Sequence, residues 1–200
     1  MLKSGGSEEL VKVKAWLETL GIKGFEPIMG AMSKKWKNWV ALIGPNTCME
    51  CIKKNGTIYN TDRLIAEVYL PPVHPNCKCK IAAMKTIVSG SATIDNLDGA
   101  DYSLKRYRRL PKNYITKAYA KANGWKKRKG NLRKVLPYAM IGGDIYDDEE
   151  GKLPSQVGRQ WYEADINYTG GYRNDYRILY SNDGLIFVTY NHYRTFYEII

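Results

Sequence analysis

The chain of 200 residues is long enough for one or two domains, and its net charge of +11 is strongly basic. Apolar residues make up 44% of it, enough for a packed core and too many for a disordered chain. The basic charge suits solubility alone or a polyanionic substrate such as RNA or DNA, because cationic surface attracts phosphate. No apolar run approaches about 18 residues, so no transmembrane helix is predicted.

The N-terminal residues are charged from the start and lack the apolar core of a signal peptide. We therefore expect synthesis in the cytoplasm, with any export by a phage-like or other route that needs no cleaved signal. Residues 7–20 have the pattern of an amphipathic helix, with Ser7 as N-cap and Gly21 after its end. The residues expected on one face of this helix are Leu10, Val13, Leu17 and Leu20.

A stretch from Ile87 onward is rich in small and turn-forming residues and is expected to be a linker. It divides the chain into four predicted segments. These are an N-terminal helical segment (1–29), a small cysteine-containing unit (30–86), the linker (87–100) and a C-terminal domain (101–200).

The C-terminal domain is predicted to begin with short helices. Residues 102–110 form a basic helix that Pro111 stops. Thr116 can cap a second helix with Gly124 near its end, and Asn131 begins a third. The charge run at 126–130 is expected to be solvated.

Strands are predicted after Gly142-Gly143. Residues 181–184 (SNDG) are a strong hairpin turn, followed by strands over 185–190 and 193–199. Helices that precede an antiparallel sheet indicate an α+β fold.

The last forty residues contain a set suited to acid–base chemistry. Glu163 and Asp165 share one face of a strand, and two arginines and a histidine follow. Such a set can cleave an RNA phosphodiester without a metal. Taken alone, each residue is better explained by an ordinary role in a surface ion pair, a turn or a sheet surface. The candidates are Glu163, Arg173, Arg177, His192 and Tyr193.

Six stretches of the C-terminal half carry a resemblance: LPxNYITKxxAxxxGW (110–125), KGNL (129–132), IGGDIY (141–146), EGKLP (150–154), WxEADINYTxGxRNxxRILYSxDxLI (161–186) and HYxTF (192–196). Through them, residues 101–199 resemble the microbial guanyl-preferring ribonucleases of the barnase family. The resemblance implies short helices followed by a twisted antiparallel sheet. It also implies that catalysis needs no cofactor.

The resemblance assigns roles to the candidates. Glu163 takes the proton of the ribose 2′-hydroxyl, and His192 protonates the departing 5′ oxygen, which gives a 2′,3′-cyclic phosphate. Tyr193 contacts the phosphate or sugar, and Asp165 orients the arginines through ion pairs. The residues expected to hold the phosphate are Lys117, Arg173 and Arg177.

In this family the loop that reads guanine corresponds to residues 146–150, with Tyr146 at its start and Glu150 as the carboxylate that meets the base. The chain departs from the family at Asp147, Asp148 and Glu149, which replace Ser-Asn-Arg. The acidic loop is expected to weaken phosphate attraction, while Asp148 can still adopt the left-handed backbone. The resemblance also implies an Arg159–Asp183 salt bridge. Tyr168, Tyr172 and Tyr180 are expected to pack in the core or on the sheet, with a position near the site as the alternative for Tyr172.

The four cysteines form two pairs, CMEC (48–51) and HPNCKC (74–79). Cys77 and Cys79 share a strand face in this interpretation, so all four thiolates can surround one zinc ion. His74 can replace one cysteine, and two disulfides or four free thiols are the alternatives. The tentative metal ligands are Cys48, Cys51, Cys77 and Cys79.

The cysteine unit also resembles the C-terminal part of phage head-morphogenesis (Mu F-like, minor capsid) proteins, through the two cysteine pairs, NGTIYNTD (55–62) and PPVHPNCKC (71–79). We therefore expect an endoribonuclease toxin whose N-terminal unit acts as carrier, with RNA as substrate and an acidic barstar-like inhibitor as partner. One alternative is a phage-derived assembly protein with phage structural partners and a C-terminal module that binds nucleic acid. The other is a zinc-dependent DNA-binding protein.

Overall fold

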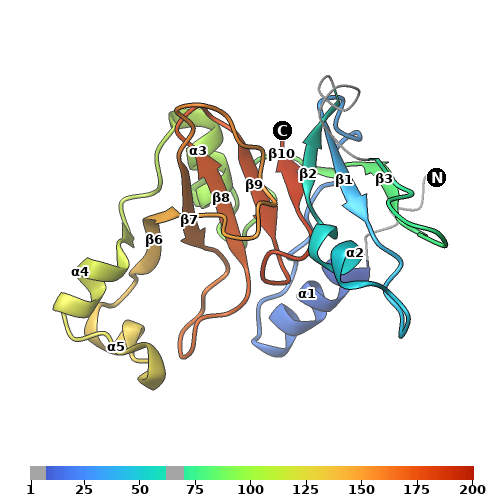
Figure 1. Ribbon diagram of the computed structural model, residues 1–200. Helices are drawn as coiled ribbons and strands as arrows, with labels where there is room; N and C mark the ends of the chain where they lie inside the picture. Colours follow the sequence, from blue (N-terminus) through green and yellow to red (C-terminus); the bar gives the residue numbers. More distant parts are fainter. Residues whose placement is uncertain (1–7, 62–69) are drawn as a thin grey trace.

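The computed structural model describes residues 8–61 and 70–200, and it contains one large and one small β-sheet flanked by short helices (Figure 1). The predicted α+β class is confirmed. Ser7, the predicted N-cap, lies outside the described residues. In chain order the elements are α1 (Glu8–Thr19), β1 (Trp36–Val40), α2 (Met49–Lys54), β2 (Ile58–Asn60), β3 (Lys80–Ala83), β4 (Thr86–Ile87), η2 (Asn96–Asp98), α3 (Ala100–Tyr107), β5 (Tyr114–Ile115), α4 (Lys117–Ala122), η3 (Lys127–Lys129), α5 (Leu132–Val135), β6 (Met140–Tyr146), β7 (Trp161–Asp165), β8 (Arg177–Ser181), β9 (Ile186–Thr189) and β10 (Tyr197–Ile199).

The large sheet has the strand order β4-β10-β9-β8-β7-β6-β5. Its strands β6 to β10 are antiparallel neighbours, whereas β5 and β4 add in parallel at its two edges. In Figure 1, α4 and α5 lie at the β5–β6 end, and the small sheet (β2-β1-β3) lies beyond β10.

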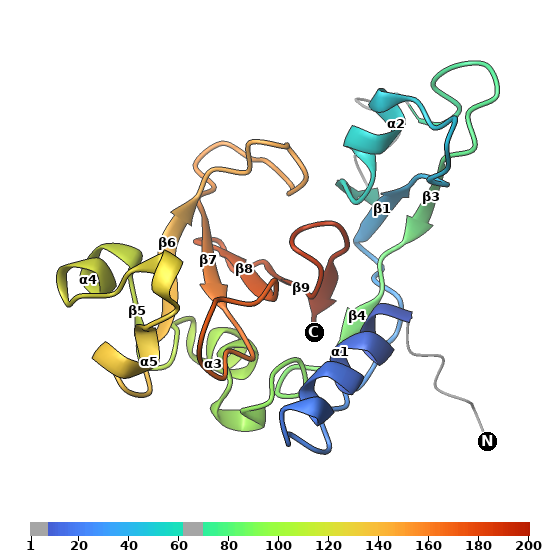
Figure 2. The same ribbon diagram turned by 90° about the horizontal axis from the view of Figure 1, so that it is seen from below.

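One face of the large sheet is covered by α1 and α3, which lie on the same side of it in Figure 2. Leu10, Val13 and Leu17 of α1 pack into the core that also holds Leu104 of α3. Leu20, predicted to share this face, is instead 46% exposed. The reason is that α1 ends at Thr19 and Gly21 turns the chain away with a φ of 77°.

The opposite face of the large sheet packs against the small sheet. Trp36 of β1 and Ile58 of β2 belong to one buried cluster with Trp161 and Phe187 of the large sheet, and the Trp36 and Phe187 rings lie 5.9 Å apart. The Ile58 N–H also donates to the Lys152 carbonyl at 2.8 Å. The cysteine unit is therefore attached to the large sheet by a shared hydrophobic core.

The interval 87–100, expected to be a linker, packs against the core instead of spanning open space. Asp101 accepts hydrogen bonds from the Gly90 N–H at 2.7 Å and the Ala92 N–H at 3.0 Å. Tyr190 donates to the Ala92 carbonyl at 2.7 Å. The connection is thus well packed, and the four-segment division stays a prediction.

The predicted N-terminal boundaries of the later helices are confirmed. Thr116 caps α4 by accepting the Tyr119 N–H at 3.2 Å, and Asn131 immediately precedes α5. The first helix of this half ends earlier than predicted, at Tyr107. Its C-terminal neighbour Arg108 takes a left-handed conformation with a φ of 58°, which stops the helix before Pro111 is reached.

The hairpin turn at 181–184 is confirmed, since it joins β8 to β9. Two strand boundaries were predicted wrongly. Strand β6 begins at Met140, where it pairs with Tyr114 of β5, and it includes the glycines. Gly142 lets β6 approach β7 closely, since a Cβ there would stand 2.5 Å from the Cβ of Ala164. Strand β10 begins at Tyr197, because His192 and Tyr193 have positive φ values of 53° and 65°, outside the extended region that side-chain-bearing residues adopt in strands.

Candidate active site

The centre of the site is the carboxylate of Glu163 on β7, which is only 7% exposed. Its Oε1 accepts a hydrogen bond from Lys117 Nζ, and its Oε2 accepts one from the Tyr193 hydroxyl at 2.5 Å. Both oxygens of this buried group are therefore held by donors from other segments, which compensates for its removal from water.

The environment of Glu163 favours its ionised form. Burial alone raises the pKa of this carboxyl, but the hydrogen bonds from Lys117 and Tyr193 and the Lys117 charge outweigh it and bring the pKa below 4.5. Burial and the neighbouring Glu163 carboxylate raise the pKa of Tyr193 well above 10, so its hydroxyl stays protonated as a donor. Near neutral pH, Glu163 is an anion able to accept a proton.

Lys117 is placed by the start of α4. Thr116 caps that helix, and the Lys117 N–H donates to the Asp144 carboxylate at 3.0 Å and 3.2 Å. Asp144 lies on β6 directly opposite Glu163 in the strand register. Sequence reasoning did not single out Asp144. The sequence feature that could have revealed it is an acidic residue directly after the glycines 142 and 143.

The two arginines are anchored by Asp165, two residues after Glu163 on the same strand. Arg173 binds its carboxylate in a bidentate manner, at 2.6 Å and 2.7 Å. Arg177 Nε lies 3.1 Å from Oδ1, although its N–H does not point straight at that oxygen. The expected ion pairs of Asp165 with both arginines are present. Burial opposes the charge of Arg173, but the bonds and charge of Asp165 dominate and raise the Arg173 pKa.

His192 and Tyr193 lie in the loop between β9 and β10. The His192 N–H donates to the Asp175 carbonyl and the Tyr193 N–H to Thr189 Oγ1, each at 3.1 Å, which holds the left-handed backbone. The imidazole of His192 is exposed, and its ring lies 4.8 Å from the Tyr193 ring. Tyr193 therefore contacts both Glu163 and His192 and brings the predicted base and acid to the same side of the sheet.

The predicted base-reading loop begins beside this group, since Tyr146 stacks on Tyr193 with ring centroids 5.1 Å apart. Asp148 has a φ of 45°, which confirms the predicted left-handed backbone. Its carboxylate accepts the Lys152 N–H at 3.0 Å and the Leu153 N–H at 2.8 Å. Asp148 therefore closes the loop. Glu150, mostly exposed, pairs with Lys152 at 2.5 Å.

The residues predicted to be structural have that role. Arg159 and Asp183 form the expected salt bridge at 2.6 Å. Tyr168 is buried, and Tyr180 packs partly buried against the core. Tyr172 differs, since it is 71% exposed, and its hydroxyl donates to the Arg128 carbonyl at 3.3 Å.

A second cluster of functional side chains lies in the cysteine unit. His74 Nε2 stands 3.1 Å from Cys48 Sγ and 3.2 Å from Cys51 Sγ, and Cys51 and Cys77 have their sulfurs 3.7 Å apart. The sulfurs of Cys51, Cys77 and Cys79 lie within 4.8 Å of one another. This Cys/His group could hold a metal ion.

One detail of the cysteine prediction was wrong. Strand β3 begins only at Lys80, so Cys77 and Cys79 lie in the preceding loop and do not share a strand face. The disulfide alternative finds no support among the described residues, which include all four cysteines, because every one is a free thiol.

Comparison with known proteins agrees with this geometry. The model of the ribonuclease family matches residues 98–200. A ribonuclease of Bacillus pumilus is 50% identical over 135 residues, covering 67% of this chain and 82% of its own length. A ribonuclease of Heyndrickxia coagulans is 56% identical over 109 residues, covering 54% of this chain and 99% of its own length. A ribonuclease of Bacillus intermedius is 56% identical over 109 residues, covering 54% of this chain and 67% of its own length.

An antiparallel sheet that presents a buried carboxylate, several cations and a histidine on one side defines an acid–base enzyme suited to phosphodiesters. The chain belongs to the ribonuclease family, with a barnase-like α+β fold. It is an endoribonuclease and acts on RNA. No helix within the described part of the chain is long and apolar enough to span a membrane.

Proposed function

We propose that this endoribonuclease cleaves single-stranded RNA by transphosphorylation, with Glu163 as general base and His192 as general acid. Glu163 takes the proton of the ribose 2′-hydroxyl, whose oxygen then attacks the adjacent phosphorus. His192 donates a proton to the 5′ oxygen as its bond to phosphorus breaks, leaving a 2′,3′-cyclic phosphate. The observation that supports this most is the buried carboxylate of Glu163, which accepts hydrogen bonds from both Lys117 and Tyr193.

The cations of the site stabilise charge that develops on the phosphate. Lys117 lies at Glu163 Oε1, and Asp165 fixes the two guanidinium groups nearby. Arginines held in this way meet phosphate oxygens without first having to be ordered, which favours the transition state. The reaction as proposed has no step that requires a metal.

We further propose a preference for guanine 5′ of the scissile bond. The loop 146–150 begins against Tyr193 and is closed by Asp148, so it can present backbone groups and Glu150 to a base beside the reacting phosphate. Tyr146 adds a stacking surface at the same place. Because Glu150 pairs with Lys152, guanine has to compete with that ion pair. The acidic residues 147–150 therefore weaken binding but leave the geometry of the loop intact.

The test is cleavage of defined oligoribonucleotides with excess EDTA, followed by identification of the product ends. We expect 2′,3′-cyclic phosphate after guanine, and a loss of at least about a hundredfold for Glu163→Ala and for His192→Ala. Tyr107→Phe is the matched control, because this 57% exposed tyrosine is on α3, which covers the face of the sheet opposite Glu163. The proposal is wrong if the wild type does not cleave, or if both variants cleave as fast as it does.

The biological role that fits such an enzyme is that of a toxin. Free ribonuclease activity harms the producing cell, so we propose an acidic, barstar-like inhibitor that covers the basic site. Residues 147–150 would meet such a partner with like charge, so its contacts there should differ from those made with a basic loop.

The resemblance to phage head-morphogenesis proteins suggests the cysteine unit as carrier. A phage assembly protein that binds RNA without cutting it is the alternative, and the cleavage assay distinguishes them.

We also propose that the cysteine unit binds one structural zinc ion through Cys48, Cys51, His74 and Cys77, with Cys79 as a spare thiol. Zinc–sulfur bonds of about 2.3 Å in a tetrahedron put two sulfurs about 3.8 Å apart, close to the 3.7 Å between Cys51 and Cys77. Two further contacts favour metal ligation. The Cys51 N–H donates to Cys48 Sγ at 3.4 Å, and His74 Nδ1 donates to the Pro75 carbonyl at 2.8 Å, which leaves Nε2 free for a metal.

Metal content of the purified chain tests this assignment without recourse to activity. We expect one equivalent of zinc in the wild type and in Cys79→Ser, and loss of zinc with a lower thermal midpoint in Cys48→Ser and His74→Ala. Retention of zinc by His74→Ala together with its loss in Cys79→Ser would instead indicate a four-cysteine site.

A further inference from the structure

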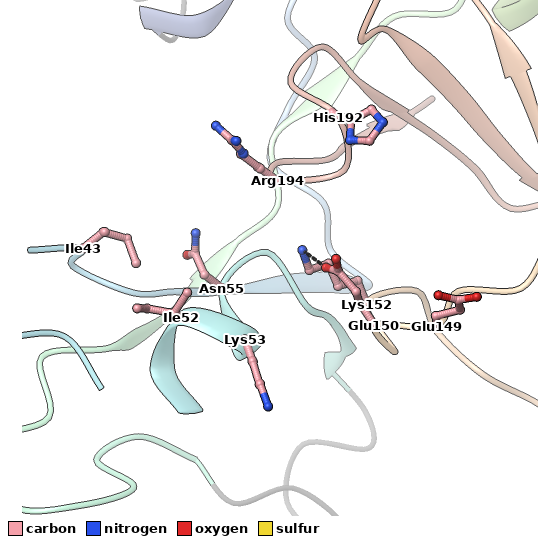
Figure 3. Close-up of a pocket in the computed structure, with 9 residues that line it drawn as sticks. All are labelled: Ile43, Ile52, Lys53, Asn55, Glu149, Glu150, Lys152, His192 and Arg194. Atoms are coloured by element: carbon pink, nitrogen blue, oxygen red, sulfur yellow. Dashed lines mark ion pairs between the residues drawn. The ribbon is translucent and has the colours of Figure 1, made fainter. Parts of the chain in front are cut away.

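A cavity of about 870 Å³ lies between the cysteine unit and the catalytic domain (Figure 3). Residues from both parts of the chain line it. The catalytic domain contributes His192 together with the end of the base-reading loop, while α2 itself and residues on either side of it supply the facing wall. The lining residues are Ile43, Ile52, Lys53, Asn55, Glu149, Glu150, Lys152, His192 and Arg194.

The wall made by the cysteine unit is fixed in place. The shared core holds Trp36 and Ile58 against the large sheet. Directly beside the cavity, a Cβ on Gly56 would stand 2.4 Å from the Arg194 carbonyl oxygen, so the two backbones are in close contact there. The Ile58 N–H donates to the Lys152 carbonyl at 2.8 Å. Packing and backbone contacts of the fold therefore hold the two walls of the cavity together.

The cavity offers the groups that single-stranded RNA needs. Lys53, Lys152 and Arg194 are cationic, against the carboxylates of Glu149 and Glu150. Lys152 and Glu150 neutralise each other as an ion pair. That leaves Lys53 and Arg194, which have no ion pair within residues 8–61 and 70–200, facing the carboxylate of Glu149. In the view of Figure 3, Arg194 and Lys53 lie on opposite sides of Asn55. Ile43 and Ile52, 57% and 39% exposed, add an apolar surface on which a base can pack.

The position of His192 indicates which part of the RNA substrate the cavity faces. The proposed acid protonates the departing 5′ oxygen, so the nucleotides 3′ of the cut must leave past His192. His192 lines the cavity, whereas Glu163 does not. The wall of the cysteine unit thus faces the downstream part of the substrate.

We propose that Lys53 and Asn55 of the cysteine unit, together with Arg194, bind the RNA strand downstream of the scissile phosphate. Arg194 contacts the phosphate that follows the leaving nucleoside, and Lys53 and Asn55 contact the strand beyond it. These cations offset the negative charge of Glu149, which lines the same cavity. The inference rests on the proposed roles of Glu163 and His192, but it assigns substrate binding to a part of the chain outside the catalytic domain.

The experiment compares two substrates that differ only downstream of the cut. The dinucleoside monophosphate GpU has no phosphate after its leaving nucleoside, whereas GpUpUpU does. We expect Lys53→Ala and Arg194→Ala each to lower kcat/KM on GpUpUpU by about fivefold, with GpU unaffected. Each variant should also make the fall of log kcat/KM with log salt shallower by roughly 0.7 on the longer substrate. Both side chains are exposed, so the variants should fold normally.

Lys34→Ala is the matched control, because this exposed lysine of the same unit does not line the cavity. Equal effects of a variant on both substrates, or no effect on either, would overturn the downstream site and leave the cleavage mechanism standing. Faster cleavage by the variants would also overturn it. If the wild type cleaves neither substrate, the proposed mechanism itself fails, and the two failures are thus distinguishable.

Discussion

The hydroxyl of Tyr193 lies 2.5 Å from Oε2 of Glu163 and donates to it. The contact crosses from the loop before β10 to β7, and it joins the buried carboxylate to the loop that carries His192. It also lowers the pKa of Glu163, so one hydrogen bond both places the acid loop and keeps the base ionised.

Tyr193→Phe should therefore move the acid limb of the pH profile. Glu163 acts only when it is deprotonated, and loss of a donor raises its pKa, so the acid limb of kcat/KM should shift to higher pH. A hydrogen bond to a charged group is worth about 1.5–3 kcal/mol. Because water replaces part of it, we expect a shift of about one pH unit. Lys117→Met should move the limb in the same direction. An acid limb that stays in place in both variants would show that Glu163 is not the titrating base.

The site residues were predictable because collinear motifs specify them without knowledge of the packing. Asp144 escaped notice because its partner is a backbone N–H 27 residues away, at Lys117. The strand over 193–199 was misplaced because hydrophobic alternation hides the left-handed conformation of His192 and Tyr193. The cavity wall could not be predicted, since it depends on the contact between Trp36 and Phe187, two residues whose own segments give no sign that they meet.

Asp165→Ala should be strongly destabilising. The carboxylate is 1% exposed and pairs with two guanidinium groups that are themselves largely buried. Removing it leaves two buried cations uncompensated, for which we expect a loss of about 3–5 kcal/mol in the free energy of unfolding. Urea unfolding at neutral pH measures this. Arg173→Ala should cost less, because Arg177 still neutralises Asp165, and a larger loss in Arg173→Ala than in Asp165→Ala would contradict the argument.

Asp183→Asn should give a pH-dependent loss of stability. The hydrogen bond from Arg159 lowers the pKa of Asp183 to about 2, from an ordinary value of 3.8. A depressed carboxyl pKa contributes stability above about pH 4, which is lost as the pH falls towards 2. Because the side chain is 39% exposed, solvent screening limits the contribution to about 1 kcal/mol at neutral pH. Urea unfolding of the variant and wild type should converge between pH 4 and pH 2. A constant difference would refute the ionic origin.

Leu17→Ala tests whether α1 belongs to the core of the catalytic domain. Leu17 is fully buried and lies in one cluster with Ile178 and Val188 of the large sheet, although more than 150 residues separate them. Truncating a buried leucine costs about 2–5 kcal/mol, because contacts are lost and a cavity remains. Leu20→Ala is the matched control on the same segment: its side chain is 46% exposed, so the change should stay within about 0.5 kcal/mol. Calorimetry on both variants decides the point. If α1 only rests on the surface, the two variants will have the same unfolding temperature. If α1 belongs to the core, Leu17→Ala will lower the unfolding temperature of the domain, and ribonuclease activity will be lost at the same lower temperature.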